Sequence, residues 1–358
     1  MGKRVWGREK IARVRVRLME WYLRCRRELP WRNSRDPYAI WVSEVMLQQT
    51  RVAVVVERYK AFMERFPTLI SLALATEQEV LAAWSGLGYY RRARMLHKAA
   101  QFVADEYQGC LPGTAEELRL LPGIGAYTAA AIASIAHGEP VAVVDGNVER
   151  VLCRMEGLST GSRSGGGSQV RHKIEELAAE LVDRDHSGDS NQALMELGAT
   201  ICLPRNPQCP TCPVADDCKT QGEHDTAPRP RMICREVAYA LSVRNGRQRI
   251  GDAHREVLLE QRPTALTVMP RMWELPTLTE TAVPEKDLQM TLRHSIMQVN
   301  YYARIRTVLE DDVETMTVAG GVRRWVPLSE AEGMALTGLT RKVLTRAHLL
   351  SIARLKTV

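Results

Sequence analysis

Four cysteines crowd into residues 202–218, with the spacing C-x6-C-x2-C-x5-C. They are Cys202, Cys209, Cys212 and Cys218, and four prolines lie among them. Four thiolates can ligate a 4Fe–4S cluster or a tetrahedral zinc ion. Zinc sites more often pair two short cysteine knuckles, and only one close pair is present here, so the spacing favours iron–sulfur over zinc. Four unligated cysteines are the remaining alternative, although helical periodicity stops in this loop and a bound metal would give it a fixed shape.

A glycine-containing turn stands at residues 121–125 (LPGIG), between two segments of helical periodicity. Gly123 and Gly125 allow a tight turn whose backbone N–H groups can approach a phosphate closely, and the following helix directs its positive N-terminus to the same place. The turn is therefore a candidate sequence-independent anchor for DNA. An ordinary turn between two helices is the alternative.

Two carboxylates could supply acid–base chemistry. Asp145 ends an apolar run (VAVVDGNV) about twenty residues after the turn, where it could act chemically or cap the next helix. Asn147 could likewise be a cap or an orienting group. Glu44 lies beside apolar Val45 and Met46, and burial there would raise the pKa of its carboxyl toward neutrality, as a general acid requires. The alternative for Glu44 is an exposed position on a helix.

The elements that must hold these groups are mostly helices. Apolar residues recur at intervals of three and four in segments 11–23, 38–48, 52–63, 78–84, 92–106, 126–136, 147–155, 170–182 and 190–201. Residues 157–168 form a Gly/Ser-rich loop, and residues 222–234 read as a linker. Beyond the linker, REVAYALSV, EVLLEQR and YYARIRTVL alternate like strands, and residues 328–353 return to helical spacing.

The charge of the chain indicates a polyanionic partner. The net charge is +7, and residues 1–35 alone carry twelve Lys or Arg against three Glu. Such a basic surface suits nucleic acid, because Lys and Arg that neutralise phosphates release counterions. No stretch of about 18 apolar residues predicts a membrane span. The N-terminus has no apolar signal region, so a cytoplasmic location is expected.

The hairpin LPGIG, the aspartate that follows it and the cysteine pattern together resemble the helix–hairpin–helix DNA glycosylase superfamily, which includes endonuclease III. The resemblance implies a mainly α protein. Residues 8–225 would form a two-lobed, all-helical glycosylase domain with its hairpin at 121–125 and a 4Fe–4S loop at 202–218. Residues 235–358 would form a smaller α+β, Nudix-like domain that reads the lesion.

Within this superfamily the chain is most similar to the adenine-specific, MutY-type branch. Residues 29–32 (LPWR) and 41–50 (WVSEVMLQQT) look like the adenine-pocket segment of that branch. The substrate-binding residues that this similarity implies are Trp31, Arg32, Gln48, Gln49 and Thr50. Bifunctional relatives carry a Schiff-base lysine where this chain has Tyr127, which implies a monofunctional glycosylase.

Two further segments bear on DNA contact. In residues 86–94 (GLGYYRRAR), Leu87 and Tyr89 could wedge between bases, although both Tyr89 and Tyr90 could instead belong to the core. In the C-terminal domain, residues 296–298 read IMQ where the family usually has Phe-Ser-His. Gln298 keeps an amide donor and an acceptor there, whereas Met297 offers only a weak sulfur acceptor. No clustered REx2EE carboxylates occur, so the domain is expected to bind rather than hydrolyse.

The implied reaction is hydrolysis of the N-glycosidic bond of adenine mispaired with 8-oxoguanine or guanine, in double-stranded DNA, by a monomer. Glu44 would protonate the base, Asp145 would stabilise the sugar cation, and Tyr127 and Asn147 would orient them. Two rivals stand beside this reading. One is a relative that acts on thymine or uracil opposite guanine, and the other is a DNA-binding module without catalysis.

Overall fold

The computed structural model describes residues 5–158, 167–223, 231–246, 255–313 and 321–350, and these form two compact units. Unit 1 comprises Met1–Leu74 and Met95–Pro228, and unit 2 comprises Ala75–Arg94 and Arg229–Val358. Unit 2 thus takes in a short segment that the sequence assigns to the domain 8–225. Within the predicted linker 222–234, residues 224–230 lie outside the described ranges, and Ile233 already belongs to a strand.

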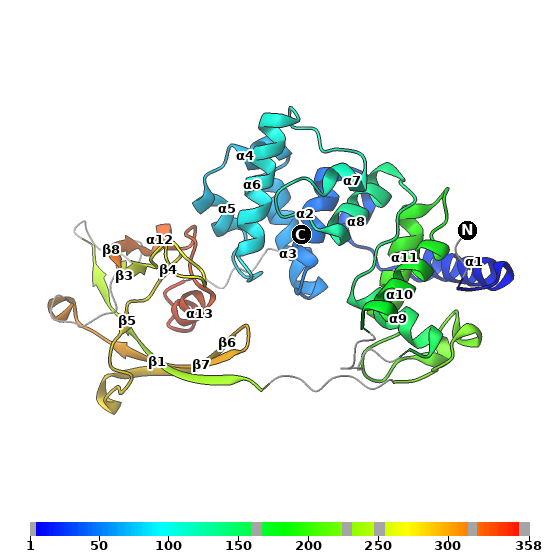
Figure 1. Ribbon diagram of the computed structural model, residues 1–358. Coiled ribbons are helices and arrows are strands. Elements are labelled where there is room, and N and C mark those ends of the chain that lie inside the picture. The colour runs from blue at the N-terminus through cyan, green and yellow to red at the C-terminus, as the bar shows by residue number, and fades with distance from the viewer. Residues whose placement is uncertain (1–4, 159–166, 224–230, 247–254, 314–320, 351–358) are drawn as a thin grey trace. The chain divides into compact units, whose positions relative to one another are not determined.

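Unit 1 is built from helices (Figure 1). In chain order they are α1 (Arg8–Cys25), α2 (Pro37–Leu47), α3 (Val52–Arg65), α4 (Leu69–Ala73), α6 (Arg91–Glu106, which begins in unit 2), α7 (Ala115–Leu118), α8 (Ala126–His137), α9 (Gly146–Glu156), α10 (Gly167–Leu181) and α11 (Ser187–Thr200). Short 3-10 turns are η1 (Pro30–Asn33), η2 (Cys209–Thr211) and η3 (Ala215–Asp217). The helical segments predicted between residues 11 and 201 all fall on helices, and in this part of the chain only the short α4 and α7 were not predicted. None of the helices in the described ranges combines the length and hydropathy that a membrane span requires.

Helix α2 is the central helix of the site. Asp36 caps it by accepting a hydrogen bond from the backbone N–H of Tyr38, and Pro37 occupies its first position. Residues 38–46 are all buried, so the helix is covered on every side. Helix α8 packs against it and is rich in alanine, which lets the two backbones come close. This packing fixes Glu44 on α2 opposite the first turn of α8.

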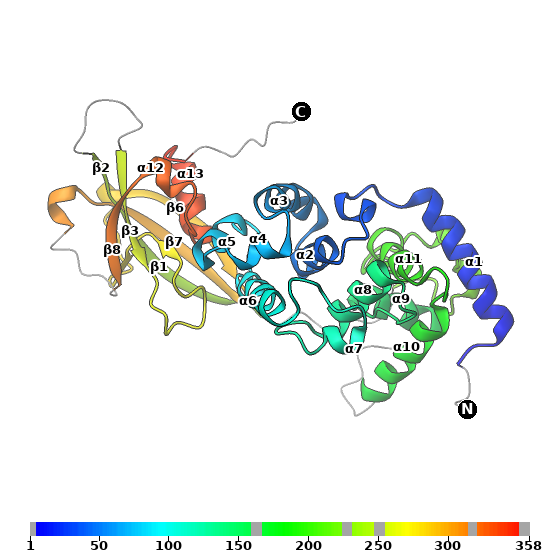
Figure 2. The ribbon, with the colours of Figure 1, turned by 90° about the horizontal axis from the view of Figure 1, so that it is seen from above.

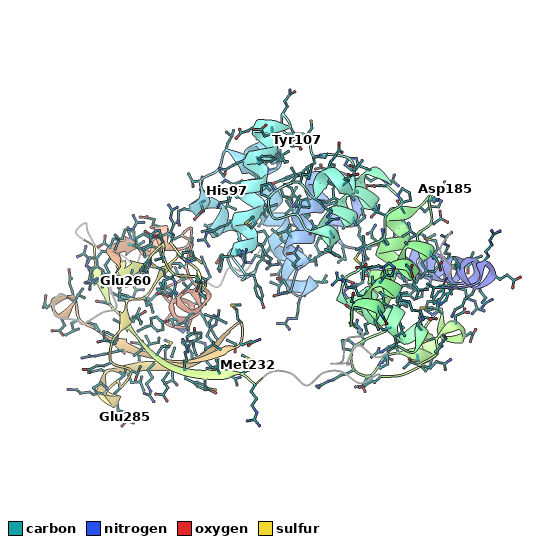
Figure 3. The ribbon with its side chains drawn as sticks, in the orientation of Figure 1. His97, Tyr107, Asp185, Met232, Glu260 and Glu285 are labelled. Atoms are coloured by element: carbon teal, nitrogen blue, oxygen red, sulfur yellow. The ribbon has the colours of Figure 1, made fainter. Side chains whose placement is uncertain are left out.

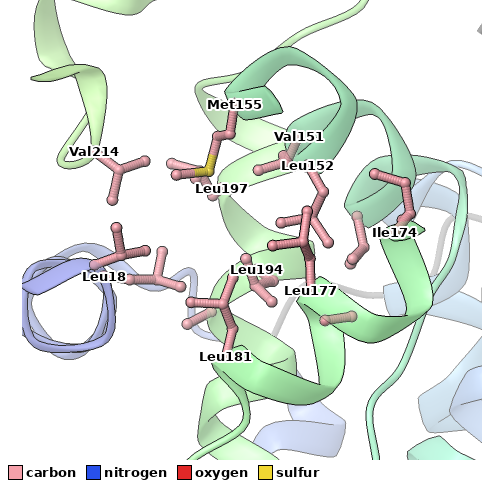
Figure 4. Packing of buried hydrophobic residues seen from close by; sticks show 14 of the residues in the cluster. Leu18, Val151, Leu152, Met155, Ile174, Leu177, Leu181, Leu194, Leu197 and Val214 are labelled. Carbon is pink, nitrogen blue, oxygen red and sulfur yellow. The ribbon is translucent and has the colours of Figure 1, made fainter. Parts of the chain in front are cut away.

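A second packed region of unit 1 joins α1, α9, α10 and α11 (Figure 4). Leu18 from α1, Leu177 from α10 and Leu194 from α11 meet Val151 and other apolar side chains of α9. Val214 of the cysteine loop packs into the same cluster, and three of the four loop cysteines lie against it. The cysteine loop is therefore attached to a helical core on one side.

In the described residues, unit 2 contains the two sheets, the three α-helices that lie wholly within it and the start of α6. The strands are β1 (Ile233–Leu241), β2 (Val243–Asn245), β3 (Arg255–Gln261), β4 (Trp273–Glu274), β5 (Thr277–Leu278), β6 (Leu288–Ile296), β7 (Val299–Thr307) and β8 (Val322–Pro327). One sheet has the order β5-β1-β7-β6, with β1 and β7 parallel; in the other, β3 pairs with β2, β4 and β8 (Figure 1). The helices are α5 (Glu77–Ala83), α12 (Leu328–Ala331) and α13 (Gly338–Arg346).

The inner faces of the two sheets and α13 share one apolar core. Figure 2 shows these sheets and α13 from above. Leu241 of β1, Leu259 of β3 and Val343 of α13 belong to it. Figure 3 places Glu260 within the second sheet, where its side chain is buried despite its charge. The α+β prediction is confirmed, but the single helical stretch predicted at 328–353 is wrong. Residues 332–337 separate α12 from α13, and Leu336 of this connection makes a bridge to β4. The Nudix-like character of this domain stays a prediction.

Candidate active site

One cavity of about 820 Å³ gathers most of the residues that the sequence singled out, and all of its lining belongs to unit 1. Its walls come from η1, α2, the turn before α8, the first turn of α9, and α11. The predicted residues in its lining are Trp31, Arg32, Glu44, Gln48, Gln49, Thr50, Gly123, Gly125, Tyr127, Asp145 and Asn147. Segments more than a hundred residues apart in the chain thus meet at one place.

Glu44 is the buried acid of this cavity, with 5% of its surface exposed. The hydroxyl of Tyr127 donates a hydrogen bond of 2.6 Å to its Oε2. The pKa of Glu44 is raised to about 7, chiefly by burial and in smaller part by the neighbouring charge of Asp145, while the Tyr127 hydrogen bond and the Arg32 guanidinium act in the opposite direction. The alternative of an exposed glutamate is therefore wrong.

Asp145 is both a helix cap and a wall of the cavity. Its Oδ1 accepts hydrogen bonds from the backbone N–H groups of Asn147 (2.9 Å) and Val148 (2.8 Å). Its Oδ2 accepts a bond of 2.8 Å from the side-chain amide of Asn147. The capping alternative is correct in itself, and the same bonds hold the carboxylate rigidly beside Glu44.

Arg150 extends this arrangement toward the cysteine loop, which the sequence did not predict. Its guanidinium donates to the side-chain oxygen of Asn147 (3.0 Å) and to the carbonyls of Gly198 (2.7 Å) and Cys202 (2.8 Å). Gly198 permits this approach, because a Cβ at that position would lie 2.7 Å from the Cβ of Asn147. The sequence does not connect Arg150 with Gly198 and Cys202, because Arg150 lies on α9 and the other two lie about fifty residues later, at the end of α11 and just after it.

A second unpredicted feature is the ion network that Glu196 forms with Arg27 and the predicted residue Arg32. The carboxylate of Glu196, on α11, is 1% exposed and binds both Arg27 and Arg32 at 2.7 Å. All three residues line the cavity. Met195, the neighbour of Glu196 in the chain, contacts the hydroxyl of Tyr127 through its sulfur at 3.5 Å.

The hairpin turn exposes its glycines beside the cavity. Gly123 has φ of 76°, and a Cβ there would lie 2.8 Å from the Cβ of Met95, so glycine is required both for the backbone conformation and for space. Gly125 is the N-cap of α8, and both glycines are exposed. An exposed turn that leads into the N-terminus of a helix suits a phosphate.

The loop at residues 86–90, in unit 2, corrects one expectation. Leu87 is only 4% exposed and packs in the interior, so it cannot reach DNA in this conformation. Tyr89 is 47% exposed and has φ of 47°, in the left-handed region. Arg92 holds the loop by donating to the carbonyls of Leu87 and Gly88, and Tyr90 is buried. Of the two candidate wedges, only Tyr89 is available.

Gln298 lies in unit 2, in the two-residue turn between β6 and β7. Both Met297 and Gln298 are exposed, and Met297 has φ of 53°. The backbone carbonyl of Gln298 accepts a bond of 2.9 Å from the N–H of Ile233 at the start of β1. The turn is therefore fixed at its backbone, with its two side chains free to contact a ligand.

The four loop cysteines line one small cavity, whose other walls are mostly apolar and include Val151, Leu197 and Val214. The guanidinium of Arg154 donates to the Sγ of Cys202 (3.4 Å) and to the carbonyl of Leu203 (2.7 Å). Within the described ranges, no three His, Cys, Asp or Glu side chains gather closely enough to hold a single metal ion. Four thiols around one cavity, with a buried positive charge beside them, fit an iron–sulfur cluster with its anionic ligands.

Comparison with known proteins agrees with this geometry. Residues 42–180 match the HhH-GPD superfamily of base excision DNA repair proteins, and residues 202–218 match the iron–sulfur binding domain of endonuclease III. The segment from residue 42 to residue 180 is therefore similar to the HhH-GPD superfamily. The predicted superfamily and the predicted iron–sulfur loop are thus confirmed.

Among curated relatives, the chain is 49% identical over 218 residues to the adenine DNA glycosylase of Rattus norvegicus, a match that covers 58% of this chain and 42% of the relative. It is 48% identical over 221 residues to the adenine DNA glycosylase of Homo sapiens, covering 59% of this chain and 40% of the relative. The match therefore spans about two fifths of these relatives.

Two solved structures are similar to the helical part. A thermostable thymine-DNA glycosylase has a TM-score of 0.53 and 29% identity, covering 60% of this chain and 97% of that one. A trapped endonuclease III–DNA covalent intermediate has a TM-score of 0.51 and 24% identity, covering 61% and 98%. The latter likeness concerns the fold alone.

Proposed function

We propose that this protein is a monofunctional adenine DNA glycosylase, which hydrolyses the N-glycosidic bond of adenine mispaired with 8-oxoguanine or guanine. The observation that carries the proposal is the pairing of Glu44 and Asp145 in one cavity beside the hairpin glycines. The relatives named adenine DNA glycosylase support the same assignment.

The first step is proton transfer to the base. An extruded adenine would enter the cavity, since the glycosidic bond is out of reach inside a duplex. With its pKa raised to about 7, Glu44 carries a proton in a large fraction of molecules at neutral pH. It donates this proton to N7 of adenine, which makes the base a better leaving group as the C1′–N9 bond breaks.

The second step is stabilisation of the sugar. As the base leaves, C1′ acquires positive charge, as in other glycoside hydrolyses. The carboxylate of Asp145 is fixed by three hydrogen bonds from Asn147 and Val148, so it can face this charge without reorganising. Glu44, now ionised, accepts a proton from water as the water oxygen bonds to C1′. This returns the acid to its starting state.

Tyr127 makes the proposed activity monofunctional. Its hydroxyl orients Glu44 through the bond of 2.6 Å, and a phenol cannot form a Schiff base with the sugar. The iron–sulfur cluster, held by the four loop cysteines, would supply a rigid cross-link for the loop. The hydrolysis is carried out by the residues of the cavity.

The experiment is excision from matched duplexes with a single A opposite 8-oxoguanine, A opposite G, T opposite G, or U opposite G. The expected result is alkali-dependent strand cleavage at the adenine of the first two duplexes. A second candidate is a thymine-acting glycosylase, favoured by the likeness to the thermostable thymine-DNA glycosylase. Cleavage at T opposite G, without cleavage at adenine, would establish that candidate instead.

Three finer points belong to the proposal. Unit 2 would read 8-oxoguanine through the turn at Met297 and Gln298, because this turn presents exposed side chains. The enzyme would act as a monomer on double-stranded DNA in the cytoplasm, without a membrane partner. Light scattering of the free and DNA-bound protein tests the monomer, and a dimeric mass in both states would contradict it.

A further inference from the structure

Glu196 is a buried carboxylate that lines the cavity without being needed for the steps described above. Its Oε1 accepts hydrogen bonds from the backbone N–H and the Nε of Arg27, at 3.0 and 2.7 Å. Its Oε2 accepts one bond of 2.7 Å from each of the guanidinium groups of Arg27 and Arg32. These partners lower the pKa of Glu196 to about 2 against the effect of burial, so it is ionised at neutral pH.

Arg32 connects this network to Glu44. Its guanidinium also donates to the backbone carbonyl of Arg27 (2.9 Å), so two separate bonds hold it in the cavity wall. Only 10% of the Arg32 side chain is exposed, which leaves little water to screen its charge. From that position it favours the ionised form of Glu44.

We propose that Glu196 is a positioning residue that balances the charge of Arg27 and Arg32, and so keeps Glu44 able to hold its proton at neutral pH. The role in catalysis rests on the proposed function, while the effect on the Glu44 proton does not. Two arginines and one glutamate leave a single net positive charge in this wall. Without Glu196 the wall would carry two.

The other charged groups that face Glu44 are few. Tyr127 contacts it from α8, and Asp145 approaches it from the first turn of α9. Arg171 of α10 also lines the cavity, and α3 contributes only apolar Val52. None of these residues takes part in the hydrogen bonds that Glu196 makes with Arg27 and Arg32. A change at Glu196 therefore alters the charge of the arginine pair and leaves the other groups around Glu44 in place.

Two substitutions should move the Glu44 proton in opposite directions. Glu196→Gln keeps the shape and one acceptor oxygen but adds one positive charge to the wall, so the pKa of Glu44 should fall by about half a unit or more. Arg27→Met removes one positive charge and keeps an apolar stem, so the pKa of Glu44 should rise by a similar amount. If the role of Glu196 is purely structural, the two substitutions should not shift the pKa of Glu44 in opposite directions.

The measurement is a titration of the full protein with carboxyl-13C glutamate, followed by NMR, in which Glu44→Gln identifies the signal of Glu44. The pH profile of single-turnover adenine excision is recorded in parallel, and its descending limb should shift with the titration. The matched control is Glu156→Gln. Glu156 is equally part of a buried ion network, with Lys173 and Lys219, but it lies outside the cavity, so its loss should leave the Glu44 titration in place.

The inference is overturned if Glu196→Gln and Arg27→Met leave the Glu44 titration unmoved, or move it in the same direction. Should Glu196→Gln fail to fold, the rise expected in Arg27→Met decides alone, because Arg27 is partly exposed and its loss is better tolerated. A wild-type protein that shows the titration but excises no adenine would refute the proposed function and leave this inference standing.

Discussion

Replacing Glu44 by glutamine should stabilise the protein at neutral pH while abolishing its activity. Glu44 is buried at 5% exposure, and burial raises its pKa from 4.5 to about 7. A raised pKa means that the folded state holds the proton more tightly than the unfolded state. The contribution of Glu44 to stability is therefore fully present below pH 4.5 and is lost as the pH rises from 4.5 to about 7, because in this range the unfolded chain ionises freely and the folded chain does not.

The size of the effect follows from the shift. The difference of 7 − 4.5, or about 2.5 units, corresponds to about 3 kcal/mol, at roughly 1.4 kcal/mol per unit. Glutamine has the same shape, does not ionise, and can still accept the hydrogen bond of Tyr127 through its carbonyl oxygen. The stability difference between Glu44→Gln and the wild type should therefore grow by about 2–3 kcal/mol between pH 5 and pH 7.5.

The assay is equilibrium unfolding in urea at several pH values, with the visible absorption of the iron–sulfur cluster reporting unit 1. Glu57→Gln, on the exposed surface of α3, is the matched control and should show no growth of the difference with pH. A difference for Glu44→Gln that stays constant from pH 5 to pH 7.5 would refute the argument. Glu44 would then ionise without penalty, and the proposed acid would have to be another group.

Four further outcomes are expected. Asp145→Asn should lose at least a hundredfold in single-turnover excision while keeping DNA affinity, and a near-normal rate would remove it from the mechanism. The purified protein should contain about four iron and four sulfide per chain, and Cys212→Ser should weaken retention of both; stoichiometric zinc in anaerobically purified protein would contradict this. Arg13→Met should speed iron loss to a chelator, because its ion pair with the cysteine loop is removed, and an unchanged rate would mean that α1 does not brace the loop. The double change Met297→Ser with Gln298→His should widen the preference for 8-oxoguanine over guanine, since a good base-edge contact contributes about 1–3 kcal/mol. If the ratio of the dissociation constants for the guanine and 8-oxoguanine duplexes is unchanged in this double variant and in Gln298→Ala, the turn does not recognise the lesion.

Much of the site could be predicted because its key groups occur in short local patterns. The cysteine spacing, the LPGIG turn and the position of Asp145 each lie within one segment, and local spacing is what a sequence displays directly. The helix pattern was equally clear, because α1, α3 and α6 each bury one apolar stripe with a period close to 3.6. Strands β4 and β5 could not be found this way, since two residues carry no periodicity.

The unpredicted residues are those whose role depends on contacts between distant segments. Glu196 and Arg27 are 169 positions apart, and nothing in either neighbourhood marks them as partners. Leu87 is a candidate wedge between bases by its place in a glycine-containing loop, yet its apolar side chain is buried in the interior. Sequence patterns identify which residues can do chemistry, but they do not say which side of the backbone faces the substrate.

Asp145 illustrates why structural and functional interpretations need not compete. The backbone N–H groups that it caps at the start of α9 are the ones that fix its carboxylate in the cavity. A cap residue has a defined backbone conformation and a side chain with little freedom, which is also what a group facing a developing cation needs. Glu44 is prepared in a different way, by burial on a helix covered on all sides. The two carboxyl groups therefore suit different tasks because their environments differ. Burial favours the protonated form of Glu44, and the N–H groups around Asp145 stabilise its carboxylate.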